Sequence, residues 1–425
     1  VAGTDQAAVR LFATDGDGTD DSDGVPARSI GPGFTQYLLA VESQGEWNLE
    51  SCGQFVHVAR QTGYGPDTVR VLVGENWWKD RSCSLNFHDK ESGSIQELVL
   101  VQAQSDNYPK TYGRLSALRG AGFSYIPNSN LSKGVDRQVF NLEELGNVQK
   151  ETGIQLIADD FYPQSRITSI TSDSLEGIEQ QINVEVSLEV MVYGLKIGVS
   201  GKFDSSSQSS DSCEYGYMNL LSSYFTREIQ YRNVMALASS DPVLYKRLFA
   251  PGFRSEIDEL VRDLNMSASE DYRMERCESF LKRFGAGVIQ KAVLGCSMEY
   301  LMSIRSSLLT NDITIGGTLT ASFGDVFDVA KISGGGEFSE KEKAVARNAK
   351  VNINARGGDT GFVGITAAGG RVDYDMVQKW QMSVTPENAA LIDIKVIPFH
   401  YIIPDPGASE IMERYYRKFL SSTDR

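Results

Sequence analysis

The clearest structural signal in this chain is Phe280-Leu-Lys-Arg-Phe284-Gly285-Ala286-Gly287-Val288-Ile289, which Leu294-Gly295-Cys296 follows closely. Across residues 270–284, the side chains of Cys277, Phe280, Leu281 and Phe284 fall on one face of an α-helix. Gly285 ends the helical pattern, and residues 287–306 have the composition of a long strand. The sequence therefore predicts a helix, a glycine turn and a long strand in direct succession.

Three other segments indicate long strands, at residues 182–203, 214–231 and 350–367. In the first, apolar and polar residues alternate, and the alternation changes phase after Met191-Val-Tyr193, as a β-bulge would produce. Since an ordinary strand has about 5 or 6 residues, these strands are unusually long.

Residues 312–349 fit no single period. Residues 318–323 alternate as a strand does, whereas Phe323, Val326, Phe327 and Ala330 form a helical stripe, and residues 339–347 favour a helix. An ambiguous segment between two long strands is typical of a conformational switch. Two ordinary helices are also expected, one capped by Ser255 and one after residues 404–407.

The chain divides into an acidic polar tail (1–29), a small β-rich module (30–108) and a larger domain (109–425). In the tail, a glycine-rich run carries four aspartates that are candidate calcium ligands, although no EF-hand pattern is complete: Asp15, Asp17, Asp20 and Asp23. A solvated tail is the alternative. In the module, Cys52 and Cys83 form a disulfide if the compartment is oxidising, and are buried thiols otherwise. Trp77 and Trp78 are either core residues or an exposed interfacial pair.

Composition excludes several functions. The net charge is −15 without a basic stripe, so no nucleic-acid partner is expected. No apolar run is long enough for a spanning helix. Neither nucleophile elbows, phosphate loops nor zinc-protease motifs occur, so we expect no enzyme and no organic cofactor. The start at Val1 leads us to expect that a targeting segment has been removed.

These segments resemble the membrane attack complex/perforin (MACPF) family. The family signature is a helix ending in an aromatic residue, then Gly-Thr-His-aromatic, then an apolar strand with Leu-Gly-Gly. It falls here on six signature positions: Phe280, Phe284, Gly285, Gly287, Leu294 and Gly295. Of these, Phe284, Gly285, Leu294 and Gly295 match the family's residues. At the turn, Ala286 and Gly287 replace the family's Thr and His, and at the bend Cys296 replaces its second glycine.

Three further segments support the resemblance, which spans about residues 110–425. Residues 120–123 and the strand expected at Val139-Phe-Asn-Leu142 resemble the opening of the family's domain. Gly357 and Gly358 resemble its hinge glycines, and Trp380, Ser383 and Pro386 resemble its closing strand.

The resemblance implies an α+β fold with a long, bent, four-stranded antiparallel sheet flanked by two helical clusters. In lytic members these clusters unravel into membrane-inserting β-hairpins, here near residues 198–213 and 316–349. The candidate insertion residues alternate along the second segment: Leu319, Ala321, Phe323, Phe327 and Val329. The first segment is too short and too polar for a hairpin, which needs about 20 residues, unless part of the flanking strands also enters the membrane.

We therefore expect a secreted or organelle-lumenal protein that binds membrane lipid and assembles with copies of itself into a ring-shaped pore. The alternative is a non-lytic structural or interaction subunit of a larger assembly. Membrane targeting is expected from the first 108 residues or from a partner.

Overall fold

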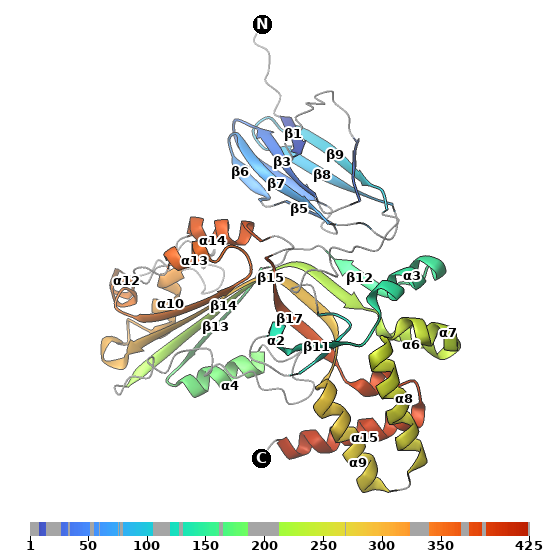
Figure 1. Ribbon diagram of the computed structural model, residues 1–425. Helices are drawn as coiled ribbons and strands as arrows, with labels where there is room; N and C mark the ends of the chain where they lie inside the picture. Colours follow the sequence, from blue (N-terminus) through green and yellow to red (C-terminus); the bar gives the residue numbers. More distant parts are fainter. Residues whose placement is uncertain are drawn as a thin grey trace. The chain divides into compact units, whose positions relative to one another are not determined.

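The computed structural model describes residues 8–13, 27–32, 35–51, 55–58, 60–74, 76, 80–104, 120–126, 131–160, 165–185, 212–267, 269–323, 340–366, 374–384 and 388–423. The chain forms two compact units, one composed mainly of residues 1–113 and the other mainly of residues 114–425 (Figure 1). The candidate calcium ligands, Cys52 and the Trp77–Trp78 pair lie outside the described residues.

The first unit consists of two β-sheets. One has the order β1-β3-β7-β5, with strands β1 (Ala8–Ala13), β3 (Thr35–Glu42), β5 (Val56–Val58) and β7 (Asp67–Val73). The other has the order β2-β9-β8-β4-β6, with strands β2 (Ala27–Ile30), β4 (Glu46–Ser51), β6 (Thr62–Tyr64), β8 (Arg81–Asp89) and β9 (Ile95–Gln102).

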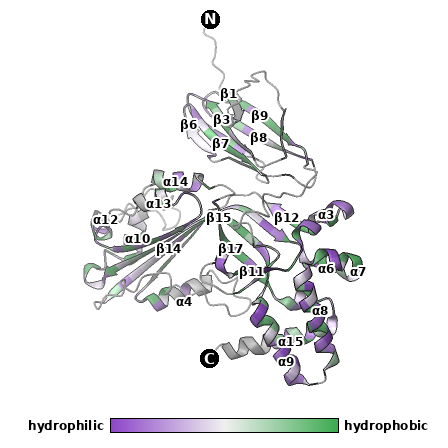
Figure 2. Ribbon diagram, viewed as in Figure 1, coloured by the Kyte–Doolittle hydropathy of each residue, from purple (hydrophilic) through white to green (hydrophobic). Residues whose placement is uncertain are grey.

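The core of this unit follows the period-two pattern of its strands. In β8 the residues Cys83, Leu85 and Phe87 are buried, and the residues between them are partly exposed. Trp47 of β4 is fully buried beside Phe87, with 6.4 Å between ring centroids, and its indole nitrogen donates to the Gly65 carbonyl. Figure 2 shows the resulting mixture of hydrophobic and hydrophilic residues along the strands. Because Cys52 is not described, its disulfide with Cys83 stays a prediction.

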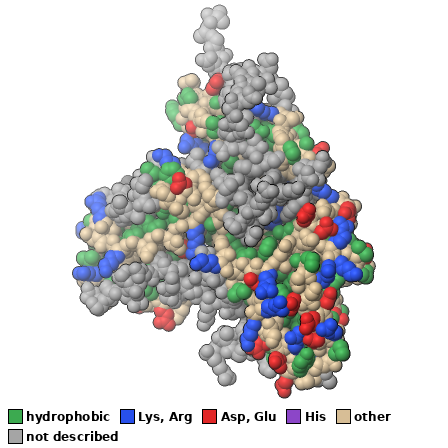
Figure 3. Space-filling model, in the orientation of Figure 1, with side chains coloured by type: hydrophobic (Ala, Val, Ile, Leu, Met, Phe, Trp, Pro, Cys, Tyr) green, Lys and Arg blue, Asp and Glu red, His purple; other side chains and the backbone are tan. Residues whose placement is uncertain are grey.

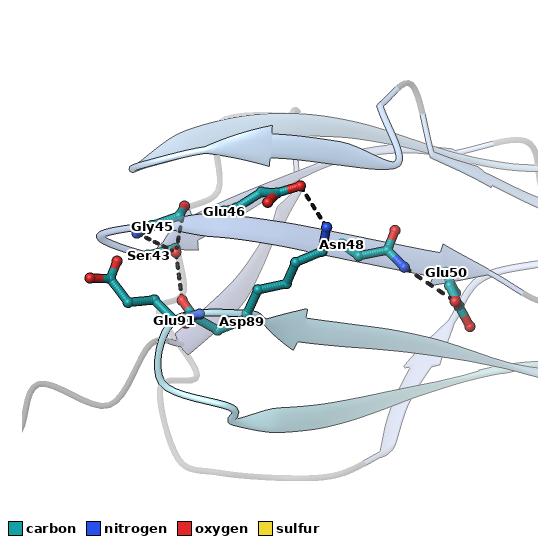
Figure 4. A network of polar contacts seen from close by, with 8 residues as sticks. Ser43, Gly45, Glu46, Asn48, Glu50, Asp89 and Glu91 are labelled. Atoms are coloured by element: carbon teal, nitrogen blue, oxygen red, sulfur yellow. Dashed lines mark hydrogen bonds and ion pairs between the residues drawn. The ribbon is translucent and has the colours of Figure 1, made fainter.

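A buried aspartate organises the β8–β9 turn (Figure 4). The Ser43 hydroxyl donates to Asp89 Oδ2 at 2.5 Å, and the backbone amides of Glu91 and Ser92 donate to Oδ1. The Ser43 hydroxyl and the Ser92 amide hold the pKa of Asp89 below its ordinary value. Since the folded pKa lies below the unfolded one, this carboxylate stabilises the fold above about pH 4, and the contribution disappears as the pH falls through the folded pKa.

We expect Asp89→Asn to lower the stability of the module by about 1 to 3 kcal/mol at neutral pH, because hydrogen bonds to a charged acceptor are lost. Calorimetry of the full chain should show that the difference in free energy of unfolding between the variant and wild type becomes smaller below about pH 4. The exposed Glu50→Gln in the same sheet is the control and should change stability by less than about 0.5 kcal/mol. A difference independent of pH would contradict the assignment.

The second unit is built on one large, mostly antiparallel sheet with the path β11-β10-β15-β14-β12 and with β13, β16 and β17 attached to it. Its strands are β10 (Phe123–Tyr125), β11 (Val135–Gln138), β12 (Ile157–Asp160), β13 (Ser165–Ser172), β14 (Cys213–Ile229), β15 (Gly287–Arg305), β16 (Lys350–Arg356) and β17 (Ala390–Ile397).

Helices precede, interrupt or follow those strands, and all of them belong to the second unit except α3, most of which groups with the first unit. They are α2 (Leu131–Gly134), α3 (Leu142–Thr152), α4 (Leu175–Glu185), α6 (Tyr231–Ser240), α7 (Pro242–Leu248), α8 (Pro251–Met266), α9 (Glu270–Phe284), α10 (Ile315–Phe323), α12 (Glu340–Ala346), α13 (Gly361–Thr366), α14 (Tyr374–Met382) and α15 (Pro406–Thr423), with the 3-10 turns η4 (Ser306–Leu308) and η6 (Phe399–Ile402).

Strands β14 and β15 run through the whole sheet, whereas the outer strands are divided in two. On one edge of β15, β16 pairs with residues 297–303, and β17 pairs with residues 288–295. Beyond β14, β13 pairs with residues 215–222. The long, bent, four-stranded antiparallel sheet is therefore β13-β14-β15-β16, as the fold prediction required, and its strands break or bulge around Gly295.

Several predicted element boundaries were wrong. The strand expected at 182–203 is contradicted only at residues 182–185, which belong to helix α4, and the rest of it lies outside the described residues. Strand β13, which was not predicted, is the outer strand. The strand expected at 350–367 ends at Arg356, before the glycine pair. Helix α8 starts at Pro251 instead of being capped by Ser255, whose hydroxyl donates to the Pro251 carbonyl.

Two segments of the family resemblance also have other structures than expected. Residues 139–142 are not a strand: Phe140 makes an isolated bridge with Phe249, and Leu142 begins α3. Trp380 lies in α14, and the closing strand is β17.

Ion pairs cover the helical cluster formed by α8, α9 and α15. Arg276 Nε lies 2.8 Å from Asp263 Oδ2, and Arg283 Nη1 lies 2.6 Å from Glu256 Oε1. Figure 3 shows acidic and basic side chains intermingled over these helices.

Within the described residues, no helix combines the length and the apolar character needed to cross a bilayer.

Candidate functional site: the bend of the central sheet

The signature segment forms a rigid junction between α9 and β15. Ser269 caps α9 by accepting from the Tyr272 amide, and Gly285 ends it with φ +83°. A Cβ on Gly285 would lie 2.1 Å from the Tyr125 carbonyl oxygen, which accepts instead from the Ala286 amide at 2.8 Å. Glycine at position 285 is therefore required both by its backbone conformation and by the close approach of β10.

Gly287 is also required by a close approach. A Cβ there would lie 2.2 Å from the Ile397 carbonyl oxygen of β17. The departure from the family residue at this position therefore accompanies tight packing of the closing strand. The hydroxyl of Tyr416 donates to the Ala286 carbonyl at 2.6 Å and ties α15 to the same turn.

An aromatic cluster anchors the junction. Phe280 and Phe284 of α9 pack against each other at 4.8 Å between ring centroids, and both contact Phe253 of α8. Phe399 closes the cluster from the turn after β17, at 5.1 Å from Phe280. Burial of these rings fixes the end of β15 that adjoins α9, which we call its lower end. The upper end of β15 lies beyond the bend at Gly295, which is described next.

The bend itself lies at Gly295. A Cβ at this residue would lie 2.0 Å from the Ser222 carbonyl oxygen of β14. Opposite Leu294 and Gly295, the pairing skips Tyr224 in β14 and Ile392 in β17, so a bulge lies on each side. Bulges bend and twist the strands that contain them, so the sheet turns here.

A pair of left-handed glycines lies against the bend. Gly357 and Gly358 have φ values of +71° and +66°, and a Cβ on Gly357 would lie 2.2 Å from the Gly295 carbonyl oxygen. The indole nitrogen of Trp380, a fully buried residue of α14, donates to the Gly357 carbonyl at 2.8 Å. The Ser383 hydroxyl accepts from the Asp359 amide at 2.6 Å. The end of β16 is thus attached to α14 at the bend.

Gly357→Ala should lower the free energy of unfolding by about 2 to 5 kcal/mol, because a left-handed backbone and a backbone clash both oppose the new methyl group. Gly153→Ala is the matched control: Gly153 has φ +70° but open space around it, so only the conformational penalty of about 1 to 2 kcal/mol applies. Urea denaturation followed by circular dichroism measures both. Equal losses would show that the contact with Gly295 is unimportant.

We call the parts of β13, β14, β15 and β16 that lie beyond Gly295, away from α9, the upper sheet. The helices α4 and α10 lie on opposite faces of it. Ile178 of α4 belongs to a buried cluster with Tyr215 and Tyr217 of β14. On the other face, Leu319 of α10 packs on Gly216, whose added Cβ would lie 3.3 Å from the Leu319 Cβ. Since successive strand residues point to opposite faces, the two helices cover both sides of β14.

Each of these helices belongs to a connection between neighbouring long strands. Residues 173–212 join β13 to β14, and residues 306–349 join β15 to β16. The first predicted switch segment, residues 198–213, lies almost entirely outside the described residues and stays a prediction, whereas helix α4 shows that the same connection also includes residues 175–185. Each connection has about 40 residues, against about 20 for a membrane hairpin.

Helix α10 is rich in residues that favour strands or turns. Its sequence Ile315-Gly-Gly-Thr-Leu-Thr-Ala-Ser-Phe323 contains two glycines and three hydroxyl residues. Thr318, Thr320 and Ser322 each donate to the carbonyl four residues earlier, which satisfies the hydroxyl groups within the helix. Intrinsic propensity therefore stabilises this helix weakly, and contact with the sheet supplies the rest.

A polar network crosses the face of the upper sheet that α4 covers. Glu299 of β15 accepts from the Tyr217 hydroxyl at 3.3 Å and from the Asn354 amide at 2.9 Å. Burial, and then the neighbouring Glu299 carboxylate, raise the pKa of Tyr217 well above its ordinary value. The network fixes the register of three strands, since each contributes one of these side chains.

The structure brings the six signature residues and both hinge glycines into one region around the junction and the bend. Leu319 and Ala321, both residues of α10, are buried at 0% and 2% exposure. The side chain of Phe323, and the residues Phe327 and Val329, lie outside the described part of the chain. Sequence reasoning missed Tyr416 and the role of Trp380, since each acts through a partner distant in sequence. Within the described residues, no cluster of potential metal ligands occurs.

Comparison with known proteins identifies the family. The family model of the MAC/Perforin domain matches residues 118–422. This match covers more than half of the chain, so the chain belongs to the MAC/perforin-domain family. No curated protein sequence matches it.

Three solved structures that resemble the chain share 12 to 15% sequence identity with it. GNIP1Aa from Chromobacterium piscinae is 15% identical with a TM-score of 0.49, over 72% of this chain and 55% of that one. A MAC/perforin-domain protein from Bacteroides thetaiotaomicron is 14% identical with a TM-score of 0.40, over 71% and 59%. The vertebrate perforin-like membrane protein Astrotactin-2 is 12% identical with a TM-score of 0.35, over 70% and 45%. The chain thus spans about half the length of these proteins.

Proposed function

We propose that this protein assembles with copies of itself on a membrane and forms a β-barrel pore. The observation that carries the proposal is the pair of long connections, residues 173–212 and 306–349, one beside each central strand. Each connection is longer than a membrane-crossing hairpin, which requires about 20 residues. If α4 and α10 unfold, β13-β14 and β15-β16 extend as two hairpins.

The sequence of α10 supports this conversion. As a strand, it places Leu319, Ala321 and Phe323 on one face and hydroxyl residues on the other. That is the apolar-out, polar-in pattern of membrane barrel strands. The weak intrinsic helix propensity of the same residues keeps the energetic barrier to the change low.

The edges of the upper sheet support assembly into a ring. With four antiparallel strands, the outer strands β13 and β16 run in opposite directions. A neighbouring copy placed with its β13 beside β16 therefore continues the antiparallel sheet, and such head-to-tail contacts close into a ring. Membrane lipid and further copies of this chain are the proposed partners, and a secreted or lumenal compartment the proposed location.

The proposal is tested by adding the purified chain to dye-loaded liposomes, with and without calcium, and measuring dye release. Electron microscopy of the same samples tests for rings. We expect release accompanied by rings on at least one lipid mixture. Neither release nor rings on several mixtures would overturn pore formation.

A non-lytic structural subunit is the second candidate. It is favoured by the charged return half of the second connection, where Glu340, Lys341, Glu342, Lys343 and Arg347 occupy both strand parities. A Lys or Arg that faces lipid costs about 2 to 4 kcal/mol near the midplane. Copurification of stoichiometric partners from native material, with no dye release, would favour this candidate.

A further inference from the structure

An ion pair joins the two halves of the bent sheet. Arg166 Nη2 in β13 lies 3.9 Å from Asp393 Oδ2 in β17. Strand β13 pairs with residues 215–222 of β14 above the bend, whereas β17 pairs with residues 288–295 of β15 below it. The side chains thus connect two strands from different halves of the sheet, which do not pair with each other.

These two side chains cannot meet in a flat sheet. Arg166 is paired with Leu221, which is paired with Ser297, whereas Asp393 is paired with Val293. Strands β13 and β17 are therefore three strand spacings apart, and the two rows are four residues apart. In a flat sheet their Cα atoms would be separated by about 19 Å. An extended arginine and an aspartate reach across less than this, so the contact requires the bend.

We propose that Arg166 and Asp393 form a strut that holds the central sheet bent and that must break before the sheet opens. This inference rests on the proposed function, because opening of the bend matters when the strands join a barrel. The side chains are 56% and 24% exposed, so dissolved ions reach the pair. Salt screens such contacts, and ionic strength thereby regulates how readily the sheet opens.

Substitutions test the energetic part of the proposal. Arg166→Gln and Asp393→Asn should each raise the initial rate of dye release by about two- to fivefold at low salt, and by less at high salt. The double variant that combines Arg166→Asp and Asp393→Arg exchanges the two charges and should return the rate to that of wild type. Arg262→Gln removes an ion pair of similar exposure within α8, far from the bend in sequence, and is the control that should leave the rate unchanged. Single variants at the wild-type rate would overturn the strut.

A reversible cross-link tests the geometric part. Arg166→Cys and Asp393→Cys are joined by a cleavable thiol cross-linker shorter than the flat-sheet separation. The native free cysteines Cys213, Cys277 and Cys296 are buried, and burial raises the pKa of Cys277 and of Cys296 to about 12, so they react slowly.

The linked protein should bind liposomes but release no dye until the linker is cleaved. Release before cleavage would overturn the strut and leave pore formation intact. Failure of the two cysteines to cross-link in solution would also overturn the strut. If wild type itself releases no dye on any lipid mixture, the proposed function fails, and the strut fails with it.

Discussion

Dye release is expected to stop completely when α10 is covalently attached to β14 by a disulfide introduced through Gly216→Cys and Leu319→Cys. The Cβ position at Gly216 lies 3.3 Å from the Leu319 Cβ, close to the about 3.5 to 4.5 Å found in disulfides. A bridge there holds α10 on the sheet, and residues 306–349 cannot then extend as a hairpin. If pore formation follows the proposed route, the oxidised protein binds membranes without permeabilising them.

The reduced form of the same double variant is the matched control. Reduction should restore release at a rate at least equal to that of wild type, because Leu319→Cys removes buried apolar contacts that hold α10 in place. The single variants, oxidised and reduced, should both remain active. Undiminished release by the fully oxidised double variant would show that α10 stays folded on the sheet during permeabilisation.

Trp380→Ala is expected to cause the largest loss of stability, about 3 to 5 kcal/mol. Trp380 is fully buried in α14, and its indole nitrogen makes the hydrogen bond to the Gly357 carbonyl. Removal of the ring leaves a cavity beside the two left-handed glycines and frees the end of β16 from α14. Urea denaturation of the full chain measures the loss.

Hydrogen exchange distinguishes a local effect at the bend from general destabilisation. The Gly358 amide donates to the Asn388 carbonyl and the Asp359 amide to the Ser383 hydroxyl, so exchange of these two amides should accelerate in Trp380→Ala. Trp380→Phe keeps most of the buried ring and should lose less stability. A loss below about 1 kcal/mol in the alanine variant, with unchanged exchange, would contradict a role for Trp380 at the bend.

The comparison of β13 with α4 shows where sequence patterns mislead. Strand β13 has apolar residues at Ile167 and Ile170, three positions apart, which is not a strand period. Its conformation comes from eight consecutive pairs with β14, a distant segment. Helix α4 contains residues that also alternate as a strand would, and the helical spacing of Leu175 and Ile178 against the sheet face decides the outcome.

The sequence by itself determined the features that depend on local stereochemistry. The stripe that ends at Phe284 specifies α9, and Gly285 and the pair at Gly357 and Gly358 supply the left-handed conformations that other residues avoid. Family membership followed from these local features.

The tertiary structure alone decided where the sheet bends and what holds it there. Gly295, with Tyr224 and Ile392 bulged on either side, bends the sheet only because β14 and β17 pair with β15 in those registers. The contact of Arg166 with Asp393 depends on the same pairing. Strand pairing joins residues far apart in sequence, and its energy depends on the partner, so no single segment of the sequence reveals it.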